Sequence, residues 1–102
     1  MIASRWDLKD GELSEATLRR RFGGDAFRLR RNVYPAATAF VGKTRACTIY
    51  ILRGSCSLRA PDEGHFTAGD VVDVDAGFYE IGVPRTCEVE IVTVWDLRPH
   101  VC

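Results

Sequence analysis

The strongest constraint on the fold is a series of short strand-like segments, separated by turns, that fills the chain after Asp25. Runs of β-branched and aromatic residues alternate there with turns that contain glycine, proline or aspartate. Short strands at a spacing of roughly 8–12 residues are typical of β-sandwiches and barrels, and a barrel also leaves few strand edges exposed. We therefore expect an all-β fold, with strands near residues 27–34, 48–52, 56–59, 71–74, 78–83 and 88–95.

Three turns divide these strands. Arg53-Gly54-Ser55 predicts a β-hairpin between two neighbouring strands. Residues 61–64 and 68–70 contain proline, glycine and aspartate and predict two further turns.

The length of 102 residues, with 46% hydrophobic and 27% charged residues, indicates one globular domain rather than a disordered chain, a collagen or a coiled coil. No apolar stretch approaches the roughly 18–20 residues that a membrane span requires. The first residues also lack the apolar core of a secretory signal. We therefore expect a soluble, cytoplasmic protein with no membrane partner.

One helix is predicted near the N-terminus. Ser14 can accept a hydrogen bond from a backbone N–H group at the start of a helix, and Leu13 and Leu18 have the spacing of a hydrophobic staple. Gly23-Gly24 then ends the helix after Phe22. A helix this short is marginal by itself, so we expect it to pack against a larger element.

The formal net charge of zero hides an asymmetry between segments. Residues 16–53 hold nine basic residues and one acidic residue, whereas residues 54–102 hold three basic and nine acidic residues. Either the basic segment forms a face that binds anions or nucleic acid, or the two segments pair as neighbouring strands whose charges neutralise each other. Exposed aromatic residues are not interleaved with the arginines, which favours the second interpretation and argues against nucleic acid. The arginines that would form the first are Arg19, Arg20, Arg21, Arg28, Arg30 and Arg31.

The four cysteines show neither a zinc-binding nor a Cys-x-x-Cys spacing. Without a secretory signal, a disulfide framework is not expected. Cys47, Cys56 and Cys87 lie in apolar strand-like runs and are predicted to be small buried hydrophobic residues. Cys102 is terminal and is predicted to be exposed.

Two segments resemble the motifs of the cupin superfamily. The run Ile49-Tyr50-Ile51-Leu52-Arg53-Gly54 resembles the end of the first motif, in which a strand ends at a turn glycine. The run from Ala68 to Gly77 resembles the second motif, with Gly69 and Gly77 at matching positions.

This resemblance covers about residues 36–97 and implies a small double-stranded β-helix, or jelly-roll, barrel that often forms a homodimer. We therefore expect a cupin-like barrel over residues 36–102. Residues 1–35 are expected to be an extension that carries the short helix and the first strand, within one structural domain overall.

Many cupins hold a divalent metal with two histidines and a glutamate from the first motif and one histidine from the second. In this chain the four ligand positions fall on Val41, Lys43, Cys47 and Glu80. The histidines present are His65, in a predicted glycine-containing turn, and His100, in the tail. A metal site of this kind needs imidazoles inside the barrel, so we expect no metal and no cofactor.

In place of a metal, the resemblance puts Lys43, Cys47 and Glu80 around one cavity. Lys43 would bind a ligand carboxylate or phosphate, Glu80 would accept hydrogen bonds or act as a base, and Cys47 would be a nucleophile whose pKa Lys43 lowers. Alternatively, Lys43 and Glu80 form an ion pair that only satisfies two buried charges, or Lys43 lies exposed at the barrel rim. The residues expected to line the cavity are Val41, Ile49, Ile51, Phe78 and Trp95.

The sequence supports three functional hypotheses. The first is a barrel that binds a small anionic molecule without the usual metal. The second is a metal-independent or atypical-metal enzyme, an isomerase, lyase or hydrolase, that uses Glu80 and Lys43. The third is a module that binds a partner or nucleic acid through the arginine-rich segment. The last strand, from Val89 to Trp95, is apolar on both sides, which predicts a second surface such as a partner subunit.

Overall fold

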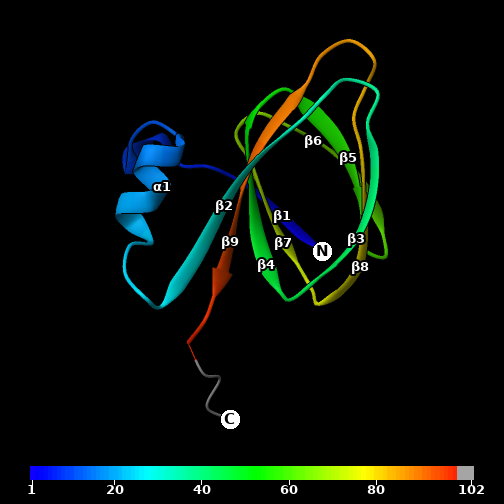
Figure 1. Ribbon diagram of the computed structural model, residues 1–102. Coiled ribbons are helices and arrows are strands. Elements are labelled where there is room, and N and C mark those ends of the chain that lie inside the picture. Colours follow the sequence, from blue (N-terminus) through cyan, green and yellow to red (C-terminus); the bar gives the residue numbers. More distant parts are fainter. Residues whose placement is uncertain (99–102) are drawn as a thin grey trace.

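The computed structural model describes residues 1–98 and shows a β-barrel-like body with one short α-helix on its outside (Figure 1). His100 and Cys102 lie outside the described residues. The strands are β1 (Ile2–Arg5), β2 (Phe27–Tyr34), β3 (Ala39–Thr44), β4 (Cys47–Arg53), β5 (Ser55–Arg59), β6 (Glu63–Thr67), β7 (Asp70–Val74), β8 (Gly77–Gly82) and β9 (Val89–Asp96). The helices are the 3-10 helix η1 (Leu8–Asp10) and α1 (Glu15–Arg21).

The strands form two antiparallel sheets. One has five strands in the order β1-β7-β4-β9-β2, and the other has four strands in the order β3-β8-β5-β6. From β2 to β9 the chain changes sheet at every connection except the one between β5 and β6. Such an arrangement of two facing sheets is a jelly roll. The predicted all-β, jelly-roll fold with a short N-terminal helix is confirmed.

The connection at Gly54 differs from the predicted hairpin. β4 and β5 belong to different sheets, so the chain crosses between sheets at Gly54 instead of folding back on itself. Gly54 has a φ of 83°, and a Cβ atom there would lie 2.3 Å from the carbonyl oxygen of Glu88. Glycine alone tolerates both this backbone angle and this close approach. The hairpin of this region instead joins β5 and β6, where Arg59 lies opposite Glu63.

Alternate residues of β4 fill two separate cores, because side chains of a strand point to opposite faces of its sheet. Cys47, Ile49 and Ile51 are buried between the two sheets. Tyr50 and Leu52 belong to a second cluster on the outer face of the five-stranded sheet. This sheet is therefore apolar on both faces at its centre.

Helix α1 covers that outer face and begins and ends where the sequence predicts. The Ser14 hydroxyl accepts a hydrogen bond of 3.1 Å from the backbone N–H of Thr17, and Phe22 forms the C-terminal cap. Leu18 is fully buried in the same cluster as Val92 of β9. The second apolar side of β9 is thus covered by the chain's own helix, which corrects the expectation of a partner subunit at that surface.

The sequence does not predict β1, β3 and β6. All three are edge strands, so each pairs with one neighbour only. All four residues of β1 are exposed, and the other two strands contain a glycine, so local propensity is weak in all three. His65 accordingly lies in β6 rather than in a turn. Cys87 is exposed, which corrects its predicted burial.

Candidate functional site

A cavity of about 280 Å³ lies between the two sheets. Its inner wall is apolar and consists of Ile49, Leu58, Val74, Ile81 and Ile91. The exposed residues among those that line it all come from β2 and β3: Arg30, Phe40 and Lys43. Because β2 and β3 are edge strands of different sheets, we place the mouth of the cavity between them.

Strand β2 presents a row of polar side chains to the cavity. Arg30, Asn32 and Tyr34 are alternate residues of this strand and all line the cavity. The same alternation places Arg31 on the opposite face, where its guanidinium pairs with the carboxylate of Glu90. Two adjacent arginines therefore have different surroundings, and only Arg30 belongs to the cavity.

The electrostatic environment of the cavity is positive. Within residues 1–98, the side chain of Arg30 makes no hydrogen bond or ion pair, and the cavity lining contains no aspartate or glutamate. Burial raises the pKa values of the Tyr34 and Tyr79 hydroxyls, and the positive charge of Arg30 offsets only part of this effect. Both phenols are therefore protonated at neutral pH and can donate hydrogen bonds to a ligand.

Three residues on the other side of the mouth form a connected group. The indole N–H of Trp95 donates to the Thr44 hydroxyl at 3.2 Å, and that hydroxyl donates to the backbone carbonyl of Arg45 at 2.9 Å. The Thr44 oxygen also lies 3.9 Å from the Cys47 sulfur. These contacts hold the Trp95 ring against the cavity.

Cys47 lines the cavity as expected, but its thiol is not activated. Burial raises its pKa, and the nearby Thr44 hydroxyl only partly opposes this. The expected lowering by Lys43 is therefore corrected, since the loss of hydration is the largest influence on the thiol. At neutral pH Cys47 is a neutral, weakly nucleophilic group.

Glu80 does not face the cavity. In the β3–β8 pair it lies opposite Val41, and both side chains are exposed. Tyr79 and Ile81 occupy the inward positions of β8, so alternation directs Glu80 to the outer face. The expectation that Glu80 and Val41 surround the cavity is corrected.

Lys43 lies at the rim of the cavity, which was one of the alternatives expected for it. Its ammonium nitrogen is 5.7 Å from the centre of the Phe78 ring, and Phe78 is 75% exposed. Phe78 therefore lies outside the cavity, contrary to expectation, because it has the same strand parity as Glu80.

The remaining residues expected to line the cavity divide into two groups. Ile49 and Trp95 line it. Ile51 is fully buried in the core and does not reach it. The polar and aromatic lining residues that the sequence did not assign to the cavity are Arg30, Asn32, Tyr34, Phe40, Thr44, Tyr79 and Thr93.

The arginine-rich segment does not form one continuous face. Arg19 pairs with Glu15 within α1, and Arg21 pairs with Asp10. Arg28 lies 5.9 Å from the centre of the Trp95 ring. The arginines are therefore distributed among the helix, the cavity, which Arg30 lines, and the cross-strand ion pair of Arg31.

Solved structures share this arrangement of two sheets. A cupin 2 domain-containing protein from Halorhodospira halophila superposes with a TM-score of 0.64 at 13% identity, covering 78% of this chain and 58% of that protein. The chain has the cupin fold. No family model and no curated protein matches the sequence.

Two further solved structures have a similar fold. An ethanolamine utilization protein Q from Salmonella typhimurium LT2 matches with a TM-score of 0.60 at 19% identity, over 72% of this chain and 61% of that chain. The polyketide cyclase RemF from Streptomyces resistomycificus matches with a TM-score of 0.63 at 18% identity, over 78% of this chain and 60% of that chain. This chain therefore matches 58–61% of the length of these three proteins.

The cavity of this cupin fold does not fit the divalent metal that the cupin resemblance implies. Of the four ligand positions, only Cys47 supplies a donor inside the cavity, and its pKa is raised by burial. The positive charges of Arg30 and Lys43 at the mouth oppose a cation. In the part of the chain that the structure describes, no three His, Cys, Asp or Glu residues are grouped to hold a metal ion.

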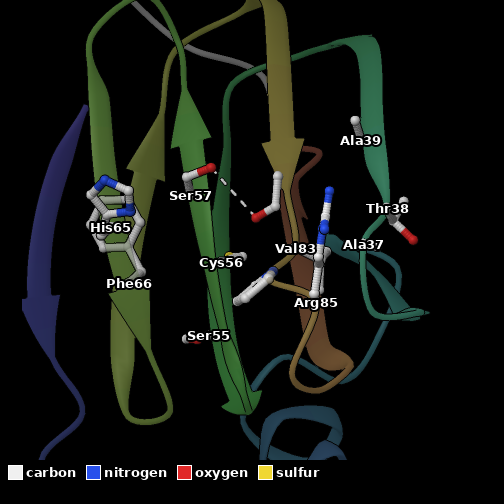
Figure 2. Close-up of a pocket in the computed structure, with 12 residues that line it drawn as sticks. Ala37, Thr38, Ala39, Ser55, Cys56, Ser57, His65, Phe66, Val83 and Arg85 are labelled. Carbon is white, nitrogen blue, oxygen red and sulfur yellow. Dashed lines mark hydrogen bonds between the residues drawn. The ribbon is translucent and has the colours of Figure 1, made fainter.

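A second groove, of about 580 Å³, lies beside β5 and the segments 37–39 and 82–85 (Figure 2). The Ser57 hydroxyl donates a hydrogen bond of 3.4 Å to the carbonyl of Gly82, and His65 lies opposite Ser57 in the β5–β6 pair. Figure 2 shows His65 and Arg85 on opposite sides of β5. Because the side chains of His65 and Arg85 do not point toward one common site, this groove is a weaker candidate for a binding site than the cavity.

Residues 1–98 contain no helix long and apolar enough to cross a membrane, since α1 has only seven residues.

Proposed function

We propose that this protein binds a small anionic molecule in the cavity of its cupin fold, without a metal, and that Arg30 pairs with the anion. The observation that supports this most directly is the position of Arg30 at the mouth, with no carboxylate partner within residues 1–98. A guanidinium is planar, always charged and able to donate two parallel hydrogen bonds to a carboxylate or phosphate.

The rest of the cavity is compatible with an anion. Lys43 adds a second positive charge at the rim, and none of the lining residues within the described part of the chain is acidic. Neighbouring charges of one sign raise the local concentration of a ligand of the opposite sign. The apolar inner wall with a few polar groups at one end has the usual make-up of a small-molecule site.

Arg30→Gln tests this proposal. Small carboxylates and phosphates are screened by thermal shift, and those that raise the melting temperature are titrated by calorimetry. We expect Arg30→Gln to weaken binding by about tenfold or more, because a hydrogen-bonded charge pair is worth roughly 1.5–3 kcal/mol.

Arg31→Gln is the matched control, since Arg31 is the next residue of β2 but points away from the cavity. This variant carries the same change of charge and is expected to bind with nearly unchanged affinity. The proposal fails if both variants bind equally well, or if no anion of the screen binds the wild-type protein.

The alternative functions receive less support from the geometry. A metal-independent enzyme was expected to use Glu80 and Lys43 in one site, whereas Glu80 lies on the outer face. A nucleic-acid face would need the arginines on one surface, whereas Arg19, Arg21 and Arg31 each pair with a carboxylate.

We also propose that the protein forms a homodimer through the outer face of β3 and β8. Val41 and Phe78 are 66% and 75% exposed there, so they form an apolar surface on neighbouring strands. Lys43 and Glu80 lie on the same two strands. A two-fold axis through this face would bring Lys43 of one protomer to Glu80 of the other, so the surface is complementary in charge to a second copy.

A further inference from the structure

The mouth of the cavity is surrounded by aromatic rings. The centres of the Tyr34 and Phe40 rings are 5.8 Å apart, and those of Phe40 and Tyr79 are 6.0 Å apart. These residues come from β2, β3 and β8, so three strands bring one continuous aromatic group to the cavity. Trp95, held by its hydrogen bond to Thr44, is a fourth ring of the lining.

The chain leaves room for this aromatic group at Gly42. A Cβ atom at this position would lie 2.9 Å from a carbon of the Phe40 ring and 2.9 Å from the Tyr79 hydroxyl oxygen. A larger residue would therefore push the two rings apart. Gly42 thus allows the two rings to lie beside the mouth of the cavity.

The polar side chains of the same region can form hydrogen bonds with a ligand. In the described part of the chain, the side chains of Arg30, Tyr34 and Tyr79 make no hydrogen bond, and no fully buried polar side-chain atom lacks a partner. Their polar atoms are consequently accessible to solvent or to a bound molecule. Because burial raises the pKa values of both tyrosines, they are neutral donors that do not repel an anion.

We propose, on the basis of the anion site above, that the ligand is a small aromatic carboxylate, with its carboxylate on Arg30 and the two tyrosine hydroxyls and its ring among Tyr34, Phe40, Tyr79 and Trp95. Aromatic pairs with centres 4.5–7 Å apart gain roughly 0.5–1.5 kcal/mol beyond the area that they bury. An aliphatic acid of the same size would make the ion pair but lose this contribution.

The volume of the cavity limits the size of such a ligand. About 280 Å³ corresponds to roughly nine water molecules at about 30 Å³ each. One six-membered ring with a carboxylate fits this space.

The test is calorimetric titration of the whole protein with three probes of similar size. Benzoate carries the ring and the charge, cyclohexanecarboxylate carries the charge on a saturated ring, and benzyl alcohol carries the ring without the charge. We expect benzoate to bind about fivefold more tightly than cyclohexanecarboxylate, as one or two ring contacts predict, and benzyl alcohol to bind more weakly than both.

Phe40→Leu should reduce the ratio of the two affinities, because it removes one of the four rings and keeps an apolar side chain at this position. Phe22→Leu, at an aromatic residue of the other cluster near α1, is the control and should keep the preference. Trp95 fluorescence in a Trp6→Phe background reports ligand binding independently, because Trp6 packs in the other cluster, near α1.

The outcomes separate this inference from the anion site on which it rests. Equal affinity for the two acids, still lost in Arg30→Gln, overturns the aromatic ligand and leaves the anion site intact. Tighter binding of benzyl alcohol than of either acid overturns both proposals, as does the absence of binding by any anion.

Discussion

At the scale of single residues, position within a strand decides what each charged group can do. Arg30 and Arg31 are neighbours in sequence, yet one lies at the cavity and the other pairs with Glu90 on the opposite face. Lys43 and Glu80, by contrast, share the outer face of the β3–β8 pair, and only Lys43 also reaches the rim of the cavity. The identity of these residues gives their chemistry, and the parity of the strand determines where that chemistry acts.

The buried thiol of Cys56 is expected to make the stability of the protein depend on pH. Burial, with a smaller contribution from the negative charge of Asp70, raises the pKa of its thiol from 9.0 to about 11. The folded protein holds this proton more tightly than the unfolded chain, so the stabilisation is complete below pH 9 and is lost as the pH rises toward 11. We expect the free energy of unfolding to fall by about 2 kcal/mol between neutral pH and about pH 10.5 on account of this thiol.

Urea unfolding at several pH values measures this effect, and Cys56→Ala is the matched variant. It should be less stable at neutral pH but lose less stability on going to alkaline pH than the wild type. An identical pH dependence in the two proteins would show that Cys56 does not titrate with a shifted pKa. Tyr50 and Tyr79, whose pKa values are also raised, contribute equally to both proteins. Tyr34 does not, because the charge of the Cys56 thiolate is one of the smaller causes of its raised pKa.

At the scale of elements, the short helix is defined locally but stabilised by its tertiary contacts. Ser14 fixes the start of α1, and seven residues are too few for a stable isolated helix. Leu18 anchors the helix in the outer core of the five-stranded sheet. The helix in turn covers Val92 and Val94, which would otherwise expose an apolar sheet face.

Leu18→Ala should therefore destabilise the whole domain by about 3 kcal/mol, since a buried leucine leaves a cavity when it is shortened. Leu8→Ala makes the same change at a residue that is 81% exposed and should alter the stability by less than about 0.5 kcal/mol. Urea unfolding followed by circular dichroism measures both. Similar stability of the two variants would mean that α1 is not packed on the sheet.

At the scale of the whole molecule, the basic and acidic segments of the chain partly neutralise each other through pairing between distant residues. Arg31 pairs with Glu90, and Arg53 pairs with Glu88, so basic residues of the first half meet acidic residues of the second. Such pairing of basic and acidic side chains across strands is the second of the two interpretations of the uneven charge distribution given above. Because both arginines reach solvent, each pair contributes little to stability.

The proposed homodimer is a prediction at the same scale. Light scattering after size-exclusion chromatography should give twice the monomer mass of 11.4 kDa for the wild type. Phe78→Ser should give the monomer mass, because it removes the largest exposed apolar group of the β3–β8 face. Ile2→Ser, a similar change at 73% exposed Ile2 in the other sheet, should remain dimeric. A monomeric wild-type protein would exclude the dimer.

The central strands and the edge strand β2 could be predicted from the sequence, whereas the other three edge strands could not. Runs such as Thr48 to Leu52 have strong β propensity and are buried on both sides. Strands β1, β3 and β6 have weaker local signals and depend on the hydrogen bonds of their single neighbour. The same limit applies to Gly54, where the local pattern of a turn is correct but the choice between a hairpin and a change of sheet depends on the packing against Glu88.

The sequence by itself determined the all-β class, the boundaries of the helix and the absence of histidines at the four metal-ligand positions, because these depend on propensity, local capping and residue identity. Only the tertiary structure decided which polar residues meet at the cavity. Arg30, Tyr34 and Tyr79 lie on β2 and β8, which belong to different sheets, and their proximity follows from the way that the two sheets face each other. A period of two places residues on one face of a strand, but it does not say whether this face is directed toward a cavity, a helix or solvent.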